Sequence, residues 1–274
     1  MRIVLLLFSL LLVGCGKKLT SIQGVAHTHP YHLQVGHSLS EKEKKEISDL
    51  ITAVFIEIDE IYNHWNPHSE LSRNLRTPKV KAILSLAQSF CELTDGWYDP
   101  TLGQPIHNFK TTGELPTKPH TVVYDLDGML KGFTIDLILE RLIKKGYKNL
   151  YIDWGGEIAT RGHHPKGRPW RVLINETPLD LTNAALATSG CQEQLWKIEG
   201  RTLTHIIDPH SLDMVEVKSG QVHQVSVRAP SGALADALAT ACMACGNLER
   251  AYAFAKKIKK EYPEVEFWMT SYDL

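Results

Sequence analysis

Two oxygen-bearing side chains, Asp236 and Thr240, lie four residues apart in a segment of helical composition. This spacing places both on one face of a helix, where a carboxylate and a hydroxyl can reach the same cation. Oxygen ligands of this kind suit magnesium, which completes its coordination shell with waters and substrate phosphates. The pair therefore indicates a magnesium site that faces a phosphate-bearing substrate.

A lysine at the start of another expected helix could bind the same substrate. Met129-Leu130-Lys131-Gly132 opens a helix directly after a short β-rich run. The free N–H groups of a helix start, the helix dipole and the Lys131 ammonium would converge on a phosphate. A lysine is also common on a solvated helix surface, so Lys131 indicates phosphate binding only together with the Asp236 and Thr240 pair. Together the two helices predict a site for a diphosphate bridged by one magnesium ion.

Both helices belong to a set of five polar clusters at the ends of expected elements, where binding residues tend to lie. Each cluster alone is weak, because Asp-Gly and Gly-Gly are common turns and an aspartate at a helix start often caps it. A single histidine also often has a structural role. The combination and order of the five favour one binding site. The clusters are residues 125–132, 153–157, 188–190, 205–209 and 236–240.

The elements that must position these clusters follow from hydrophobic periodicity. Apolar residues at three- and four-residue spacing predict helices at 41–65, 78–93, 127–146, 232–245 and 248–260. We expect a loop at 99–119 and a β-rich run at 121–126. Strands are predicted at 150–153, 170–175, 184–188, 195–198, 202–207, 222–228 and 265–270. No linker divides the chain, so the pattern is a single α+β domain with N-terminal helices and a mostly antiparallel sheet.

The composition is that of a well-cored globular protein, with 43% hydrophobic residues among 274 and a formal net charge of −1. This balance gives no global attraction to nucleic acid or to an anionic membrane surface. Nucleic acid is therefore not an expected partner, and any phosphate binding must be local.

The first residues have the features of a secretory signal. Met1 and Arg2 precede a largely apolar run at 3–13, which is too short to span a bilayer and ends in small residues. The alternative is a buried helix broken at Gly14, but nothing downstream continues its periodicity. We therefore expect a signal peptide at 1–14.

Leu12-Val13-Gly14-Cys15 resembles a bacterial lipobox, in which the cysteine becomes the lipidated first residue of the mature protein. An acylated Cys15, for example one carrying palmitate, would anchor the chain to a membrane. We expect a tether at 15–23 and the domain at 24–274, exported and facing the periplasm of a bacterium. The sequence leaves open whether the inner or the outer membrane holds the anchor.

Four more cysteines are Cys91, Cys191, Cys242 and Cys245, which an exported protein could pair as disulfides. Cys242 and Cys245 form a C-x-x-C, a spacing also found in redox and zinc pairs. No second pair with ligand spacing lies nearby, and the segment is helical in composition. We expect these two to be small buried helix residues.

The order of the motifs resembles that of the ApbE family, the FAD:protein FMN transferases. The similar stretches are DLDGMLKG at 125–132, GGE at 155–157, PWR at 169–171, TSG at 188–190, HIIDP at 205–209 and DALAT at 236–240. The resemblance runs from about Gly24 to the C-terminus. It implies a domain of the ApbE, T-fold-like type. It also implies magnesium-dependent transfer of FMN from FAD to a threonine of a target flavoprotein, with release of AMP.

The resemblance also implies roles for single residues. The side chains of Asp236 and Thr240 and the carbonyl of Gly128 would bind magnesium. Residues expected to contact FAD are Trp65, Thr101, Leu102, Asp125, Lys131, Ile206 and Ile207. His205 is the expected general base for the threonine hydroxyl, because histidine can accept a proton near neutral pH.

Two other functions stay open at this point. One is an FAD pyrophosphatase, which would use water as acceptor and give FMN and AMP. The other is a lipoprotein that binds and delivers flavin without catalysis. For the transferase, the family implies a membrane redox-complex subunit as partner, such as one of the sodium-pumping NADH:quinone reductase.

Overall fold

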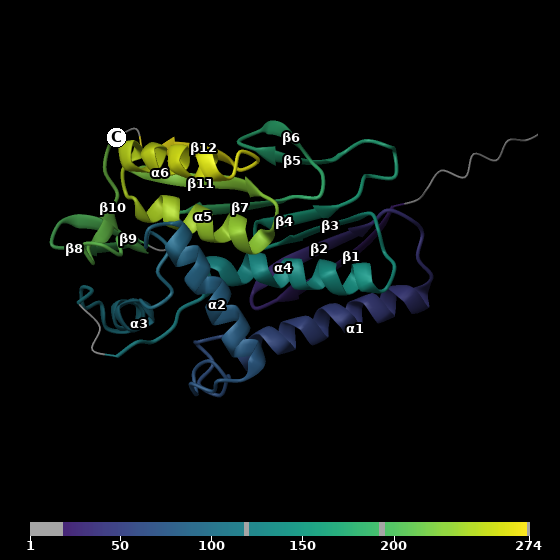
Figure 1. The fold of residues 1–274 in the computed structure, drawn as a ribbon, viewed down its shortest axis with the longest axis horizontal. Coiled ribbons are helices and arrows are strands. Elements are labelled where there is room, and N and C mark those ends of the chain that lie inside the picture. The colour runs from purple at the N-terminus through teal and green to yellow at the C-terminus, as the bar shows by residue number, and fades with distance from the viewer. Residues whose placement is uncertain (1–18, 118–120, 192–194, 273–274) are drawn as a thin grey trace, which may run out of the picture.

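A seven-stranded antiparallel sheet forms the centre of the structure, a computed structural model that describes residues 19–117, 121–191 and 195–272 (Figure 1). The strand order is β1-β2-β3-β4-β7-β11-β12. The strands are β1 (Thr20–Ala26), β2 (His29–Val35), β3 (Leu150–Trp154), β4 (Glu157–Arg161), β7 (Ala185–Gly190), β11 (Val222–Ala229) and β12 (Glu266–Ser271). Every neighbouring pair is antiparallel.

Helices α4 and α5 pack on this sheet, and α1 packs on α4 (Figure 1). The helices are α1 (Glu41–Glu57), α2 (Pro78–Leu93), α3 (Gly103–Thr112), α4 (Asp127–Lys144), α5 (Gly232–Ala244) and α6 (Leu248–Glu261). A capping box of Ser40 and Glu43 starts α1, and Thr77 with Pro78 starts α2. Helix α5 is apolar on nearly all sides and lies buried between the sheet and its neighbours.

Two small sheets complete the fold. One is the hairpin of β5 (Trp170–Ile174) and β6 (Thr177–Leu181), and the other has the order β10-β9-β8. Its strands are β8 (Leu195–Ile198), β9 (Arg201–Ile207) and β10 (Met214–Glu216). Phe109 of α3 and Leu203 of β9 share a small core of their own, which attaches α3 to this sheet.

The single α+β domain with a mostly antiparallel sheet is confirmed, and α2, α4, α5 and α6 lie close to their predicted bounds. The hairpin turn at Glu199-Gly200 has φ of +50° and +79°, as a tight turn between twisted strands requires. Cys242 and Cys245 are buried free cysteines at the end of α5, as expected.

Several boundaries differ from the prediction. The loop expected at 99–119 contains α3, and the run 121–126 forms no strand, only a bridge between Val123 and Leu102. The helix expected at 41–65 changes at Ile58 into a short π-helix, η1 (Ile58–Tyr62). Strands β1, β2, β4, β6 and β10 were not predicted, because most of them lack strict alternation of buried and exposed residues. Since β1 begins at Thr20, residues 20–23 belong to the sheet and not to the tether.

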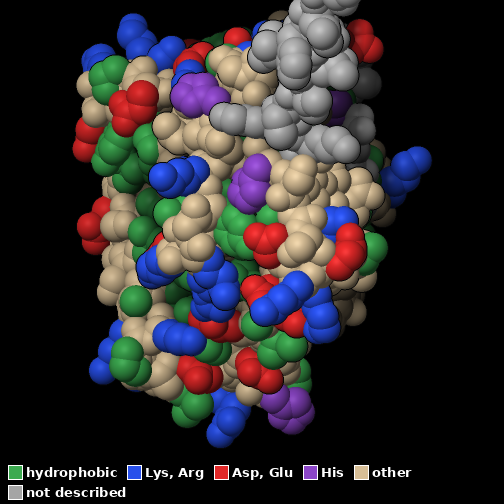
Figure 2. Space-filling model, turned by 90° about the vertical axis from the view of Figure 1, so that its right-hand side faces the viewer, with side chains coloured by type: hydrophobic (Ala, Val, Ile, Leu, Met, Phe, Trp, Pro, Cys, Tyr) green, Lys and Arg blue, Asp and Glu red, His purple; other side chains and the backbone are tan. Residues whose placement is uncertain are grey.

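The charges at the end of the molecule where α1 begins and α4 ends are mixed. Figure 2 shows Lys and Arg side chains interspersed there with Asp and Glu. Many are paired locally along α1 and α4, as in Lys44 with Glu41, Lys45 with Asp49 and Lys144 with Glu140. This face therefore offers no single-sign field to a charged polymer, in agreement with the near-neutral net charge.

Helices α4 and α5 cross at two glycines. A Cβ atom on Gly132 would lie 2.1 Å from the carbonyl oxygen of Gly232, and one on Gly232 would lie 2.5 Å from that of Gly132. The backbones therefore meet with no room for a side chain. This crossing brings the start of α4 beside the middle of α5.

We expect Gly132→Ala to destabilise the protein by about 1–3 kcal/mol, the usual range for overpacking. Helix propensity alone would favour alanine by about 1 kcal/mol, so a net loss reports the clash. Urea unfolding measures the effect. Gly190→Ala is the control, because its nearest neighbours would be 3.8 Å away. An unchanged midpoint in Gly132→Ala would show that the helices can separate at little cost.

Candidate functional site

All five polar clusters line one cavity of about 530 Å³. The cavity lies where the start of α4, the middle of α5, the ends of β7 and β9 and the β3–β4 turn meet. Of the sequence-predicted residues it is lined by Trp65, Leu102, Asp125, Gly128, Lys131, His205, Ile206, Ile207, Asp236 and Thr240. Thr101 does not line it, but its hydroxyl donates to Oδ1 of Asp99, which does.

The expected metal ligands come together from α4 and α5. Thr240 Oγ1 donates to the carbonyl oxygen of Gly128 at 3.2 Å, across 112 residues of sequence. A Cβ atom on Gly128 would lie 2.8 Å from Thr240, so this close approach requires glycine. Asp236, only 3% exposed, accepts from the backbone N–H of Gly132 at 3.0 Å through Oδ2. A carbonyl, a hydroxyl and a carboxylate at one wall form the oxygen donor set that magnesium prefers.

Lys131 is held beside this group by Glu157, a residue without a predicted role of its own. Its Nζ lies 2.8 Å from Oε1 of Glu157, a side chain 2% exposed at the start of β4. Gly155 and Gly156 form the tight turn that brings β4 back along β3. Glu157 stands in the quoted GGE motif, but its contact with Lys131 depends on the position of α4 over β4.

The cavity concentrates carboxyl groups that burial disfavours in their charged form. Burial, followed by the charge of Asp236, raises the pKa of Glu157 to about 8, and Lys131 opposes the shift. Burial raises the pKa of Asp236 to about 6, against Lys131 and the N–H of Gly132. Burial, then Asp127, raises the pKa of Asp125 to about 6. A bound cation would favour the charged form of these buried carboxyl groups, so the cavity favours cation binding.

Glu157 should also make the stability of the free protein depend on pH. Its folded-state pKa of about 8 is above the ordinary value of 4.5, so the folded chain holds a proton that the unfolded chain loses in this window. The free energy of unfolding therefore falls as pH rises from about 4.5 to 8. We expect Glu157→Gln to reduce this fall, measured by urea unfolding at several pH values. The exposed Glu264→Gln is the control, and equal slopes in Glu157→Gln and the unmodified chain would refute the assignment.

Aromatic side chains also line the cavity. Trp65 is 38% exposed. Its ring packs at a tilt on His107, with 5.3 Å between the ring centroids, and Lys110 Nζ lies 5.0 Å from the centroid of the Trp65 ring. A partly exposed indole that lines the cavity can stack on a flat ring of a ligand. Lining residues to which the sequence analysis assigned no role of their own include His27, His29, Trp97, Asp127, Trp154 and Glu157, and the last three belong to the predicted clusters.

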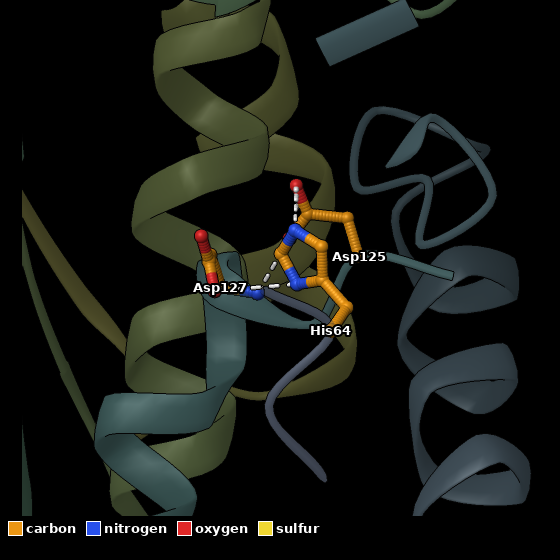
Figure 3. A group of neighbouring side chains, drawn as sticks. All are labelled: His64, Asp125 and Asp127. Atoms are coloured by element: carbon orange, nitrogen blue, oxygen red, sulfur yellow. Dashed lines mark hydrogen bonds and ion pairs between the residues drawn. The ribbon is translucent and has the colours of Figure 1, made fainter. Parts of the chain in front are cut away.

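His64 contacts Trp65, with 4.6 Å between their ring centroids. It lies between Asp125 and Asp127 (Figure 3). Asp127 begins α4, and its Oδ2 accepts from Trp65 Nε1 at 2.9 Å. Asp127 was inside a quoted motif, so its position was available in the sequence. His64 carried no signal beyond its place next to Trp65.

The HIIDP segment ends in a tight turn. Asp208 Oδ1 accepts from the N–H groups of His210 and Ser211, and Leu212 takes a left-handed φ of +63°. A β-carbon disfavours that conformation, which glycine adopts freely. The turn supports β9 directly after His205, Ile206 and Ile207.

Two further sequence predictions concern the membrane. Cys15 and the expected signal lie outside the described residues. Within residues 19–117, 121–191 and 195–272, no helix has both the length and the apolar character needed to span a bilayer.

Comparison with known proteins places this architecture in a family. A sequence profile of the ApbE family matches residues 105–265. The FAD:protein FMN transferase of Chlamydia pneumoniae is 36% identical, covering 88% of this chain and 90% of its own length. The chain belongs to the ApbE family. A more distant relative, the FAD:protein FMN transferase of Haemophilus influenzae, is 24% identical over 93% of this chain and 89% of its own.

Solved structures of the ApbE family share the fold. The flavinyl transferase ApbE of Pseudomonas stutzeri, in its apo form, has a TM-score of 0.79 at 20% identity and covers 94% of this chain and 92% of its own. The ApbE protein of Thermotoga maritima has a TM-score of 0.75 at 19% identity, with 93% and 97% covered. The expectation of an ApbE-type fold is therefore confirmed.

Proposed function

We propose that this ApbE family member transfers FMN from FAD to a threonine hydroxyl of a target flavoprotein, in a magnesium-dependent reaction that releases AMP. The observation that carries the proposal is the meeting of Gly128, Asp236 and Thr240 with Lys131 in one cavity. Relatives that share most of the chain are named FAD:protein FMN transferase, which supports the same reaction.

The reaction breaks one bond and forms one. The threonine oxygen attacks the phosphorus on the FMN side of the FAD diphosphate, and the bond from that phosphorus to the AMP oxygen breaks. The hydroxyl proton passes to a base of the protein. The products are a threonine–FMN phosphoester and AMP, so atoms and charge balance.

Each part of the cavity has a task in this scheme. The Gly128 carbonyl, the Asp236 carboxylate and the Thr240 hydroxyl would hold magnesium, which supplies positive charge to the diphosphate when bound. Lys131 offers an ammonium beside them, directed by Glu157. Trp65 provides a ring surface, Asp125 a carboxylate for the nucleotide, and His205 the base.

The direct test is incubation of the purified protein with FAD, Mg²⁺ and an acceptor protein that carries the threonine. Mass spectrometry should find FMN added to the acceptor, and EDTA should prevent it. FMN and AMP formed without modified acceptor would instead identify a pyrophosphatase. FAD binding with no turnover in magnesium would identify a flavin-binding protein. The acceptor to try first is a membrane redox subunit of the sodium-pumping NADH:quinone reductase type.

We also propose that the protein is exported and anchored to a bacterial membrane through a lipid on Cys15. Cys15→Ser should then release the protein into a soluble exported fraction, or leave the signal uncleaved, because no thiol is available for acylation. Cell fractionation and the mass of the N-terminal peptide measure this. Cys91→Ser is the control, since Cys91 lies in α2. Unchanged processing and membrane association in Cys15→Ser would exclude the anchor.

A further inference from the structure

His64, Asp125 and Asp127 form a compact group at the edge of the cavity, apart from the proposed magnesium ligands (Figure 3). His64 Nε2 lies 3.7 Å from Asp125 Oδ2, and His64 Nδ1 lies 3.7 Å from Asp127 Oδ1. One ligand atom from each residue lies within 4.8 Å of the other two. The three side chains therefore converge, although they come from two separate parts of the sequence.

The imidazole of His64 is buried without hydrogen bonds. Its side chain is 4% exposed, and neither ring nitrogen has a hydrogen-bond partner. A separation of 3.7 Å is too long for an N–H···O hydrogen bond. A buried polar nitrogen left in this state costs about 1–3 kcal/mol. A bound ligand that accepts the lone pair of a His64 ring nitrogen would remove this cost.

The same separation suits two ligands of one metal ion. Ligand atoms about 2.0–2.2 Å from a common ion, at angles of about 109–120°, are about 3.3–3.8 Å apart. The spacing between His64 Nε2 and Asp125 Oδ2 falls in this range. Each carboxylate faces a different ring nitrogen, and one ion would bind only one of the two nitrogens. Because one ligand atom from each residue lies within 4.8 Å of the other two, a small rotation of the second carboxylate would bring it to the same ion.

Outer hydrogen bonds already orient both carboxylates. Asp125 Oδ1 accepts from the backbone N–H of Asp127 at 2.8 Å, and Asp127 Oδ2 accepts from Trp65 Nε1 at 2.9 Å. In each carboxylate the other oxygen is the one that faces His64. Metal ligands are commonly held in this way by a second set of hydrogen bonds.

We propose that His64, Asp125 and Asp127 bind a divalent transition-metal ion of the zinc type, at a site separate from the magnesium ligands Gly128, Asp236 and Thr240. One imidazole nitrogen with two carboxylates suits zinc, whereas the all-oxygen set suits magnesium. Three protein ligands leave a coordination position for water or a ligand atom. The start of α4 carries a partial positive charge of about +0.5, which disfavours a cation. Two carboxylates carry more negative charge than this, so the net field at the site still attracts a cation.

Zinc titration in excess magnesium tests the site without reference to catalysis. The full chain, freed of metal by dialysis, is titrated calorimetrically with Zn²⁺ in the absence of FAD and with Mg²⁺ in large excess. We expect the unmodified chain to bind one more zinc ion than His64→Ala, or to bind it at least about 100-fold more tightly, since even outer-shell changes cost 10–100-fold. Other zinc-binding sites are present in both the unmodified chain and His64→Ala, so they do not contribute to the difference between the two titrations.

Matched variants define the result. His68→Ala removes an exposed histidine of the same loop and should bind zinc like the unmodified chain, as should Asp236→Ala. His64→Gln, with circular dichroism, covers the case in which His64→Ala does not fold. Anomalous diffraction at the zinc edge should place the ion at His64.

Equal zinc binding in the unmodified chain and both His64 variants would overturn the proposal, and would favour a protonated His64 paired with the two carboxylates. A zinc peak away from His64 would do the same. Because the readout is zinc binding without FAD, a failure of the flavin-transfer proposal would leave this result unaffected.

Discussion

Replacing Asp236 with Ala should lower the rate of FMN transfer by at least about 10²–10³-fold, since positioned charge in such sites contributes several kcal/mol. Asp236 is a side-chain carboxylate beside Gly128 and Thr240 in the cavity wall, so its loss removes the anionic ligand of the proposed magnesium site. FMN incorporation into the acceptor, measured at several Mg²⁺ concentrations, gives the size of the effect. Near-normal rates at low magnesium would show that the metal assignment is wrong.

The stability of this variant should change much less than its activity. Ser231 caps α5, whereas Asp236 lies within the first half of the helix, so its removal takes away no helix cap. Removal of the Asp236 carboxylate leaves the N–H of Gly132 without its acceptor, which costs about 1–3 kcal/mol of stability. The same change removes the unfavourable burial of a charged carboxylate near Glu157, which offsets part of that cost.

Asp136→Ala is the matched control for Asp236→Ala. Asp136 lies on α4, and its Oδ2 accepts from the N–H of Ala233 at 3.0 Å, so it also links α4 to α5. It does not line the cavity. Asp136→Ala should therefore lose stability and keep the transfer rate per folded molecule. Equal loss of activity in both variants would show that the helix contact, and not the ligand, is what matters.

Replacing His205 with Ala should lower the transfer rate by roughly 10²–10⁴-fold while FAD affinity changes little, as expected for loss of a general base. His205 lies on β9 and lines the cavity with Ile206 and Ile207. Protonation of the imidazole should also lower the wild-type rate at acidic pH. This acid limb should be absent in the variant.

A structural role for His205 predicts a different pair of results. Thermal stability and FAD binding would fall together, and the acid limb would survive in His205→Ala. His210→Ala is the control, because His210 lies three residues after Ile207, packs on Trp97 and does not line the cavity. An unchanged pH profile with intact FAD binding would direct the search for the base to Asp208 or Asp236.

The sequence by itself determined the helices with strong periodicity, the α+β class and the order of the motifs. In α2 and α4 the apolar residues repeat at the helical period, and Thr77, Pro78 and the turn at Gly146 mark their ends. Strands β1 and β2 were missed because exposed and partly buried residues are mixed along them, so the sequence shows no regular hydrophobic alternation. Their hydrogen-bonded pairing with each other and with β3 makes them strands. Helix α3 was missed because packing of Phe109 on β9 stabilises a segment that contains Gly103 and Pro105.

Only the tertiary structure decided which polar residues meet. Types and spacing predicted that Asp236 and Thr240 share a helix face, but their approach to Gly128 depends on the crossing of α4 and α5 at Gly132 and Gly232. The pairing of Lys131 with Glu157 depends on where α4 lies over β4. Periodicity indicates which face of an element is buried, but it contains no distance between elements. The packing of the folded core therefore decides which of these groups meet, and the same burial raises the pKa of Glu157.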